Sequence, residues 1–145
     1  MLTQHEITPS EHWSWFNRAS RDGTRALVVV EESNIKLGCV TFSGVQNNST
    51  ADWSFYVAPG SPAGTGKRVC RSALNYAFSE LLIYKVAGQV IDFNQASINV
   101  HRSLGFNQEG QLRRHILING VHCDLLHFGI LSSEWTLVNE LLTNI

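Results

Sequence analysis

The chain has 145 residues, of which 43% are hydrophobic and 16% charged, and a formal net charge of −1 at pH 7. This length predicts one domain over residues 1–145, and the near-neutral charge excludes a basic surface for nucleic acid. No apolar run is long enough to span a membrane, and the three widely spaced cysteines form no zinc pattern, so we expect a cytoplasmic protein without a metal.

The N-terminal half predicts one helix followed by three strands. Thr8-Pro9-Ser10-Glu11 has the pattern of a capping box with proline at the first helical position, which predicts a helix over residues 8–21. Apolar and β-branched residues then predict antiparallel strands over residues 26–30, 35–42 and 50–57.

A loop rich in glycine and proline follows over residues 58–66 and leads into a predicted helix over residues 67–82. Glycines in such a loop let backbone N–H groups approach an anion, and the helix start adds unpaired donors and a positive dipole end. Lys67, Arg68 and Arg71 add positive charge. The loop therefore suits a pyrophosphate, although plain turn chemistry is an alternative and the spacing matches neither the Walker nor the dinucleotide pattern.

The C-terminal half predicts a strand over residues 85–93, a short helix over 94–104 and a final helix over 133–142. Between the two helices, Asn119-Gly120 is a strong hairpin signal and joins predicted strands over residues 109–118 and 121–131. The complete order of elements is that of a mixed α/β domain with one central sheet.

The segment that begins this short helix has Asn94, then Ser97 three residues on, His101 seven residues on, and finally Gly105-Phe106. Together with the Gly-x-Gly loop, it resembles the pattern of the GNAT superfamily of N-acetyltransferases. The resemblance implies a mostly antiparallel sheet that splays at the cofactor site, with helices on both faces. Acetyl-CoA would lie in the gap between the strands that end near Val57 and Phe93.

The same resemblance implies which residues bind the cofactor. The pantetheine would pair with the backbone of residues 55–57, and the pyrophosphate would lie on residues 63–67. Ser61 departs from the family pattern, because relatives carry arginine or glutamine there. The expected cofactor residues are Phe55, Tyr56, Val57, Ala63, Gly64, Thr65, Gly66, Lys67, Arg68, Asn94 and Ser97.

His101 and Asn94 are the expected catalytic residues. His101 occupies the position where family members often carry a tyrosine as general acid, and an imidazolium can protonate a thiolate. A surface or capping histidine is the alternative. Asn94 is expected to bond the cofactor or the backbone across the splay, to serve as a helix N-cap, or to do both. Gln89 stands where many relatives carry a glutamate, so general-base work would pass to a water chain, Asp92 or Glu6.

Several further segments resemble the N-acetyltransferase family of pseudaminic acid biosynthesis, which modifies flagellin and surface glycans; among them are residues 3–7, 53–57, 85–90 and 109–113. The resemblance implies a UDP-linked 4-amino-dideoxy sugar as acceptor and leaves a homodimer open. It also suggests that a first strand and helix are missing here. The expected acceptor residues are His5, His12, Trp15, Tyr56 and Gln89.

Two other functions are compatible with the same residues, because the motifs concern the cofactor and not the acceptor. One is acetylation of a protein N-terminus or another small amine. The other is a non-catalytic acyl-CoA-binding module, which the glutamine at position 89 favours.

Overall fold

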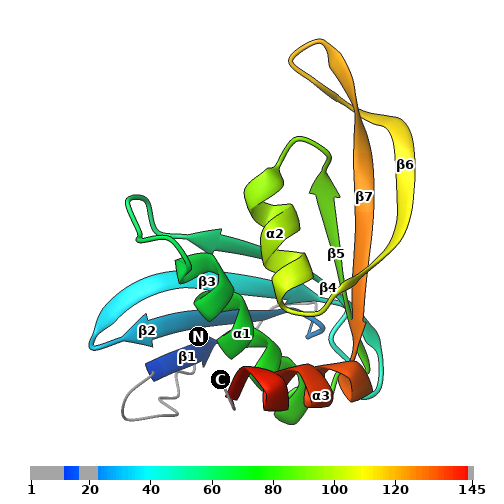
Figure 1. Ribbon diagram of the computed structural model, residues 1–145. Coiled ribbons are helices and arrows are strands. Elements are labelled where there is room, and N and C mark those ends of the chain that lie inside the picture. The colour runs from blue at the N-terminus through cyan, green and yellow to red at the C-terminus, as the bar shows by residue number, and fades with distance from the viewer. Residues whose placement is uncertain (1–11, 17–22, 144–145) are drawn as a thin grey trace. The chain divides into compact units, whose positions relative to one another are not determined.

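The computed structural model describes residues 12–16 and 23–143 of the chain. It divides into two compact units, Met1–Tyr84 and Lys85–Ile145. Each unit combines strands with helices (Figure 1), so the mixed α/β class expected from the sequence is confirmed. In the described part of the chain, no helix has the length and apolar character needed to cross a membrane.

The first unit is an antiparallel sheet with one helix packed against it (Figure 1). Its strands follow one another in chain order, each paired antiparallel with the next. The described elements are β1 His12–Phe16, β2 Ala26–Glu32, β3 Ile35–Ser43, β4 Thr50–Val57 and α1 Thr65–Ser79.

The core of this unit lies between α1 and one face of the sheet. Val28 pairs with Val40, and Phe42 pairs with Trp53, so buried side chains of three adjacent strands share that face. The buried positions of α1 recur at helical spacing: Val69, Cys70, Ala73, Leu74 and Ala77. Burial of each larger side chain is worth about 1.5–3 kcal/mol, so this apolar face of α1 holds the helix against the sheet.

The helix expected over residues 8–21 is wrong where the structure describes it, because His12–Phe16 is the strand β1. Its Trp13 pairs with Val30 and its Trp15 with Val28 of β2. The capping-box pattern just before β1 is a local signal only. Aromatic residues favour strands, and pairing with a buried β-branched strand outweighs a local capping preference.

The second unit is a three-stranded antiparallel sheet in which β7 lies between β5 and β6. The turn of the β6–β7 hairpin is formed by Asn119 and Gly120, whose φ angles of 49° and 80° are those of the turn that Asn-Gly favours. The described elements are β5 Lys85–Ile91, α2 Gln95–Ser103, β6 Asn107–Ile118, β7 Val121–Leu131 and α3 Ser132–Thr143.

Side chains of β7 alternate between two faces of this sheet. Phe128 and its even-numbered neighbours point toward α2, because the Phe128 ring stacks on His101 of that helix. The odd-numbered residues, including His127 and Gly129, occupy the opposite face. Gly105, with a φ of 92°, directly follows Leu104, the C-cap residue of α2.

Candidate functional site

The start of α1 has no side-chain cap. Its N-cap residue is Gly64, with a φ of 90° that suits glycine, and the first turn holds no acidic residue. The Arg68 N–H donates to the Gly64 carbonyl at 3.2 Å, so the N–H groups of Gly66 and Lys67 precede the first intrahelical bond. Such a helix start presents backbone donors and a positive dipole end to an anion.

The loop before α1 is held in shape by its own hydrogen bonds. The Ser61 hydroxyl donates to the Ala58 carbonyl at 2.6 Å, and the Thr65 hydroxyl donates to the Pro62 carbonyl at 2.7 Å. Thr65 is only 2% exposed. The Thr65 side chain therefore shapes the loop, and among the cofactor residues expected here the exposed ones are Ala63, Gly64 and Arg68.

The basic residues of this helix start differ in their surroundings. The Arg68 guanidinium forms an ion pair with the Glu32 carboxylate at the end of β2, and both side chains are well exposed. Lys67 is half-buried beside it. Because Glu32 balances part of the Arg68 charge, Lys67 is the stronger candidate for an anion contact.

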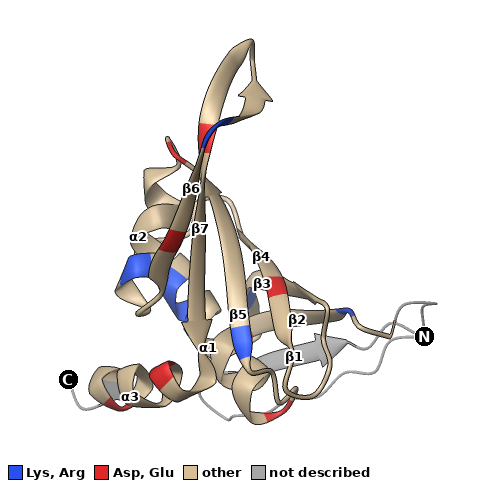
Figure 2. Cartoon of the chain, turned by 90° about the vertical axis from the view of Figure 1, so that its right-hand side faces the viewer, with Lys and Arg blue, Asp and Glu red and all other residues tan. Residues whose placement is uncertain are grey.

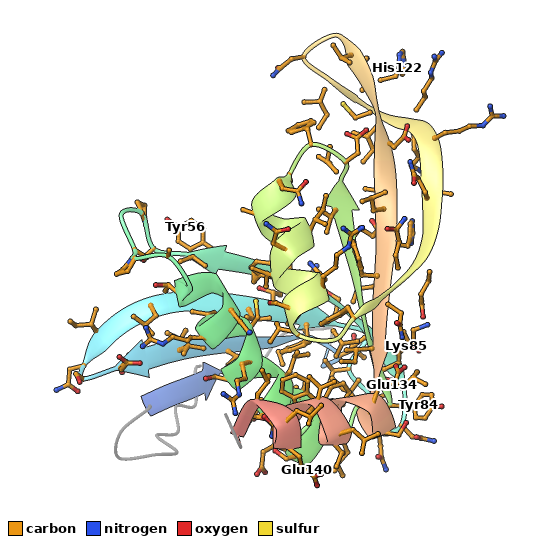
Figure 3. The ribbon with its side chains drawn as sticks, in the orientation of Figure 1. Tyr56, Tyr84, Lys85, His122, Glu134 and Glu140 are labelled. Atoms are coloured by element: carbon orange, nitrogen blue, oxygen red, sulfur yellow. The ribbon has the colours of Figure 1, made fainter. Side chains whose placement is uncertain are left out.

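The end of β4 leads directly into this loop. Tyr56 is 58% exposed and projects from β4 (Figure 3), whereas the Phe55 ring packs edge-on against Trp53 at 5.3 Å. On the neighbouring strand, a Cβ at Gly38 would overlap the Tyr56 carbonyl oxygen. Glycine at position 38 therefore allows β3 and β4 to approach closely where the pantetheine is expected.

Asn94 is the N-cap of α2, as one of the two sequence alternatives had it. Its Oδ1 atom accepts a hydrogen bond from the Ser97 N–H at 3.2 Å. The side-chain oxygen of Asn94 and the N–H of Ser97 are thus used inside the chain.

His101 is a core residue of the second unit, with an exposed fraction of 2%. Its ring stacks on Phe128 at 5.1 Å and meets Phe106 edge-on at 4.9 Å. Burial lowers the pKa of His101, and the hydrogen bond to the Ser97 carbonyl partly offsets that effect. A carbonyl can only accept, so Nδ1 carries the proton in that 2.8 Å bond and a neutral ring has none on Nε2. Burial therefore opposes the charged form that a general acid needs.

Gln89 is exposed on β5, directly opposite His127 on β7. His127 has a buried Nε2 atom with no hydrogen-bond partner in the described part of the chain. The sequence alone did not identify His127, because only the β5–β7 register brings it beside Gln89. Asp92 is less suited to base work, since its Oδ2 accepts from the Asp124 N–H at 3.4 Å.

The structure places the expected residues in two groups, one around β4 and the start of α1 and the other on β5 and α2. His5 and Glu6 lie outside the described residues. His12 and Trp15 lie on β1, for which the structure describes only the backbone. Within residues 12–16 and 23–143, no group of three or more histidine, cysteine, aspartate or glutamate side chains could hold a metal ion.

A family model described as "Acetyltransferase (GNAT) domain" matches residues 1–107 of the chain. Among curated proteins, the SPbeta prophage-derived uncharacterized N-acetyltransferase YokL of Bacillus subtilis is 34% identical over 120 residues. That match covers 81% of this chain and 67% of YokL. The spermidine N(1)-acetyltransferase of Escherichia coli K12 is 25% identical, with coverage of 83% and 66%. The chain thus spans about two thirds of the length of these two relatives.

Solved structures of the spermidine N-acetyltransferase from Vibrio cholerae have a similar fold. One, of mutant forms of the enzyme, has a TM-score of 0.72 and 26% identity, and the match covers 80% of this chain and 72% of that one. Another, in complex with CoA and spermine, has a TM-score of 0.71 and 25% identity over 78% and 69% of the two chains.

Proposed function

The chain belongs to the acetyltransferase (GNAT) family, and from this premise we propose that it transfers an acetyl group from acetyl-CoA to a primary amine. The observation that carries the proposal is the family match over residues 1–107, which includes the whole Gly64 loop and α1. The relatives named above are N-acetyltransferases, and one solved relative holds CoA.

The start of α1 fits the diphosphate of acetyl-CoA. Gly64 leaves room for a close approach, the N–H groups of Gly66 and Lys67 precede the first helical bond, and no acidic side chain lies in the first turn. Lys67 adds a positive charge to these donors. The pantetheine contact with residues 55–57 remains a prediction from the family resemblance.

The reaction needs a neutral amine nitrogen at the thioester carbonyl. Acetyl-CoA supplies an activated acyl group with a thiolate leaving group. The protein must remove a proton from the ammonium form of the acceptor and return one to the departing sulfur. His101 as the donor of that second proton stays a prediction, which its burial and lowered pKa oppose. Asn94 is proposed to act by fixing the start of α2.

Two acceptors have specific support. A polyamine is favoured because relatives from two genera are named spermidine N-acetyltransferases. A UDP-linked 4-amino-dideoxy sugar is favoured by the segments that resemble the pseudaminic acid enzymes and by the exposed aromatic ring of Tyr56. We put the polyamine first, because its support comes from matches along four fifths of the chain. The cytoplasmic location and the homodimer remain expectations.

A side-by-side assay tests this proposal. The purified chain is mixed with acetyl-CoA and, in parallel, with spermidine, the UDP-4-amino sugar or a peptide with a free N-terminus, and CoA release is followed. Release that depends on spermidine confirms the polyamine, and release that depends on the sugar transfers the assignment to the second acceptor. Binding of acetyl-CoA without release for any amine would identify a non-catalytic acyl-CoA-binding module.

A further inference from the structure

The arginine in the first turn of α1 is engaged by a carboxylate that comes from another element of the same unit. The Arg68 Nη2 atom donates a hydrogen bond to the Glu32 Oε2 atom, and the two residues are 36 positions apart in the chain. The loop over residues 58–66 and the first turn of α1 contain no acidic residue of their own. The fold of the first unit therefore brings a negative charge to a helix start whose own segment has none.

Glu32 is the last residue of β2, at a well-defined place in the sheet. Ser33 and Asn34 have φ angles of 52° and 66°, which are those of a two-residue turn that leads into β3. The register of β2 with β3 shifts between Val30 and Glu31, and such a bulge re-aims the side chains beside it. The turn and the bulge together place the Glu32 carboxylate where it reaches Arg68.

The backbone of Arg68 is fixed, whereas its side chain is open to solvent. The Arg68 N–H donates to the Gly64 carbonyl at 3.2 Å, and the next residue, Val69, is completely buried. The Arg68 side chain itself is 45% exposed. The guanidinium can therefore exchange one partner for another without any movement of the helix.

The strands β2, β3 and β4 carry few charges that could compete for this arginine. They are largely uncharged (Figure 2), and their charged residues are Glu31, Glu32, Lys36 and Asp52. Glu31 stands opposite Lys36 in the register of β2 with β3. Asp52 lies near the start of β4, whereas the loop before α1 follows its end. Glu32 is thus the acid of these strands that meets Arg68.

The ion pair of Arg68 with Glu32 is weak enough to be replaced by a stronger one. The two side chains are 45% and 37% exposed, and ion pairs in contact with water contribute little to stability. A phosphate group offers an arginine two parallel, charge-assisted hydrogen bonds in a geometry that its planar guanidinium matches. A phosphate that reaches the start of α1 can therefore take Arg68 from Glu32, but it must break the ion pair to do so.

We propose that Glu32 is a positioning residue for Arg68, which holds the guanidinium beside the start of α1 and competes for it with a phosphate group of the cofactor. This inference rests on the proposed function, in which acetyl-CoA binds at that helix start. The competition weakens the binding of CoA and speeds its release as a product. Glu32 thereby sets the affinity of a site whose direct contacts come from Lys67 and the backbone N–H groups.

The test measures the Kd of the full chain for CoA by calorimetry and the rate of CoA dissociation by stopped flow. Glu32→Gln keeps the size of the side chain and removes its charge. This variant is expected to lower the Kd about three- to fivefold, mainly through slower dissociation. The difference from the unaltered chain should shrink at about 1 M salt, where charges are screened over about 3 Å. A purely structural role of Glu32 would not give this dependence on salt.

The matched control is Glu31→Gln, which makes the same change in net charge at the neighbouring residue and should leave the Kd for CoA unchanged. A second comparison removes the arginine. Arg68→Gln is expected to raise the Kd about threefold, and Glu32→Gln should bring no gain in affinity when it is combined with Arg68→Gln.

The outcomes separate the two proposals. A Kd that Glu32→Gln raises or leaves unchanged, a gain that Glu31→Gln shares, or a gain that persists without Arg68 would overturn this inference and leave the acetyltransferase function standing. Failure of the unaltered chain to bind CoA or acetyl-CoA would overturn the proposed function, and the inference with it.

Discussion

The starts of α1 and α2 differ in whether a side chain of the protein caps the unpaired backbone N–H groups. Both helices follow a strand and a short loop. At the start of α2 a side chain of the protein provides the cap, because the Asn94 Oδ1 atom accepts a hydrogen bond from the Ser97 N–H. At α1 the N-cap is Gly64, no side chain takes that role, and the first turn has no acid. The difference supports the prediction that an external anion binds at the start of α1 and not at the start of α2.

The two helices also differ in how they use their polar side chains. On α2, the His101 ring lies in the core between Phe106 and Phe128, and its Nδ1–H donates a hydrogen bond to the Ser97 carbonyl. On α1, Lys67 and Arg68 stand in the first turn at the surface of the unit. The second helix is therefore expected to affect mainly stability, and the start of the first mainly cofactor affinity.

The largest effect is expected at His101. His101→Ala should lower the free energy of unfolding by about 3 kcal/mol, since it removes a buried ring between two phenyl groups. Acetyl-CoA affinity should not change. Thermal unfolding and calorimetric binding check the two parts. If the variant keeps its stability and loses only kcat, His101 is the proton donor. The contrast between α2 as a stability element and α1 as the cofactor element would then be wrong.

The same variant should change the pH dependence of stability. The pKa of His101 is lowered in the folded state, so the unfolded chain binds this proton more readily. Stability from this source is present above the unfolded value of about 6.5 and is lost as the pH falls from there through the folded value. His101→Ala should remove that loss, which denaturant unfolding at several pH values measures.

The next effect is at Lys67. Lys67→Glu should raise the Kd for acetyl-CoA about tenfold, or about 1.4 kcal/mol, because it sets a negative charge against the diphosphate. The stability of α1 should not fall, because an acidic side chain near a helix N-terminus interacts favourably with the helix dipole. The matched control is Gln95→Glu at the start of α2, which should leave the Kd unchanged. Equal loss in both variants would show that α1 has no special role.

The smallest effect is at Asn94. Asn94→Ala should lower stability by about 1 kcal/mol through loss of the cap, with acetyl-CoA affinity intact. Chemical denaturation and calorimetry distinguish this from the alternative in which Asn94 touches the cofactor. A drop in affinity beyond what the stability loss explains would support that alternative.

The elements that the sequence predicted well are those whose signal is local and strong. The alternation of β4, the loop before α1 and the Asn119-Gly120 hairpin all appear where expected, with the ends of elements moved by a few residues. The strand β1 was missed because its pairing with β2 is a tertiary effect, whereas the capping-box pattern beside it is local. The alternation of His12, Trp13, Ser14 and Trp15 was the signal that could have found it.

For the candidate site too, the sequence predicts what depends on a local segment and misses what depends on tertiary pairing. The uncapped start of α1 is readable from Gly64 to Arg68, because it depends on residue types in a short segment. The position of His127 beside Gln89 is not readable in this way, because it depends on the register of β5 with β7, two strands that are far apart in the chain. The burial of His101 is likewise a product of packing against Phe128 and not of its own helix.

The most direct test of the central claim, that the start of α1 holds the cofactor, is an NMR titration of the backbone amides with CoA. The account predicts large shifts for the N–H groups of Gly66 and Lys67 and small ones for the capped Ser97 N–H at the start of α2. Shifts at Ser97 without shifts at Gly66 and Lys67 would contradict it.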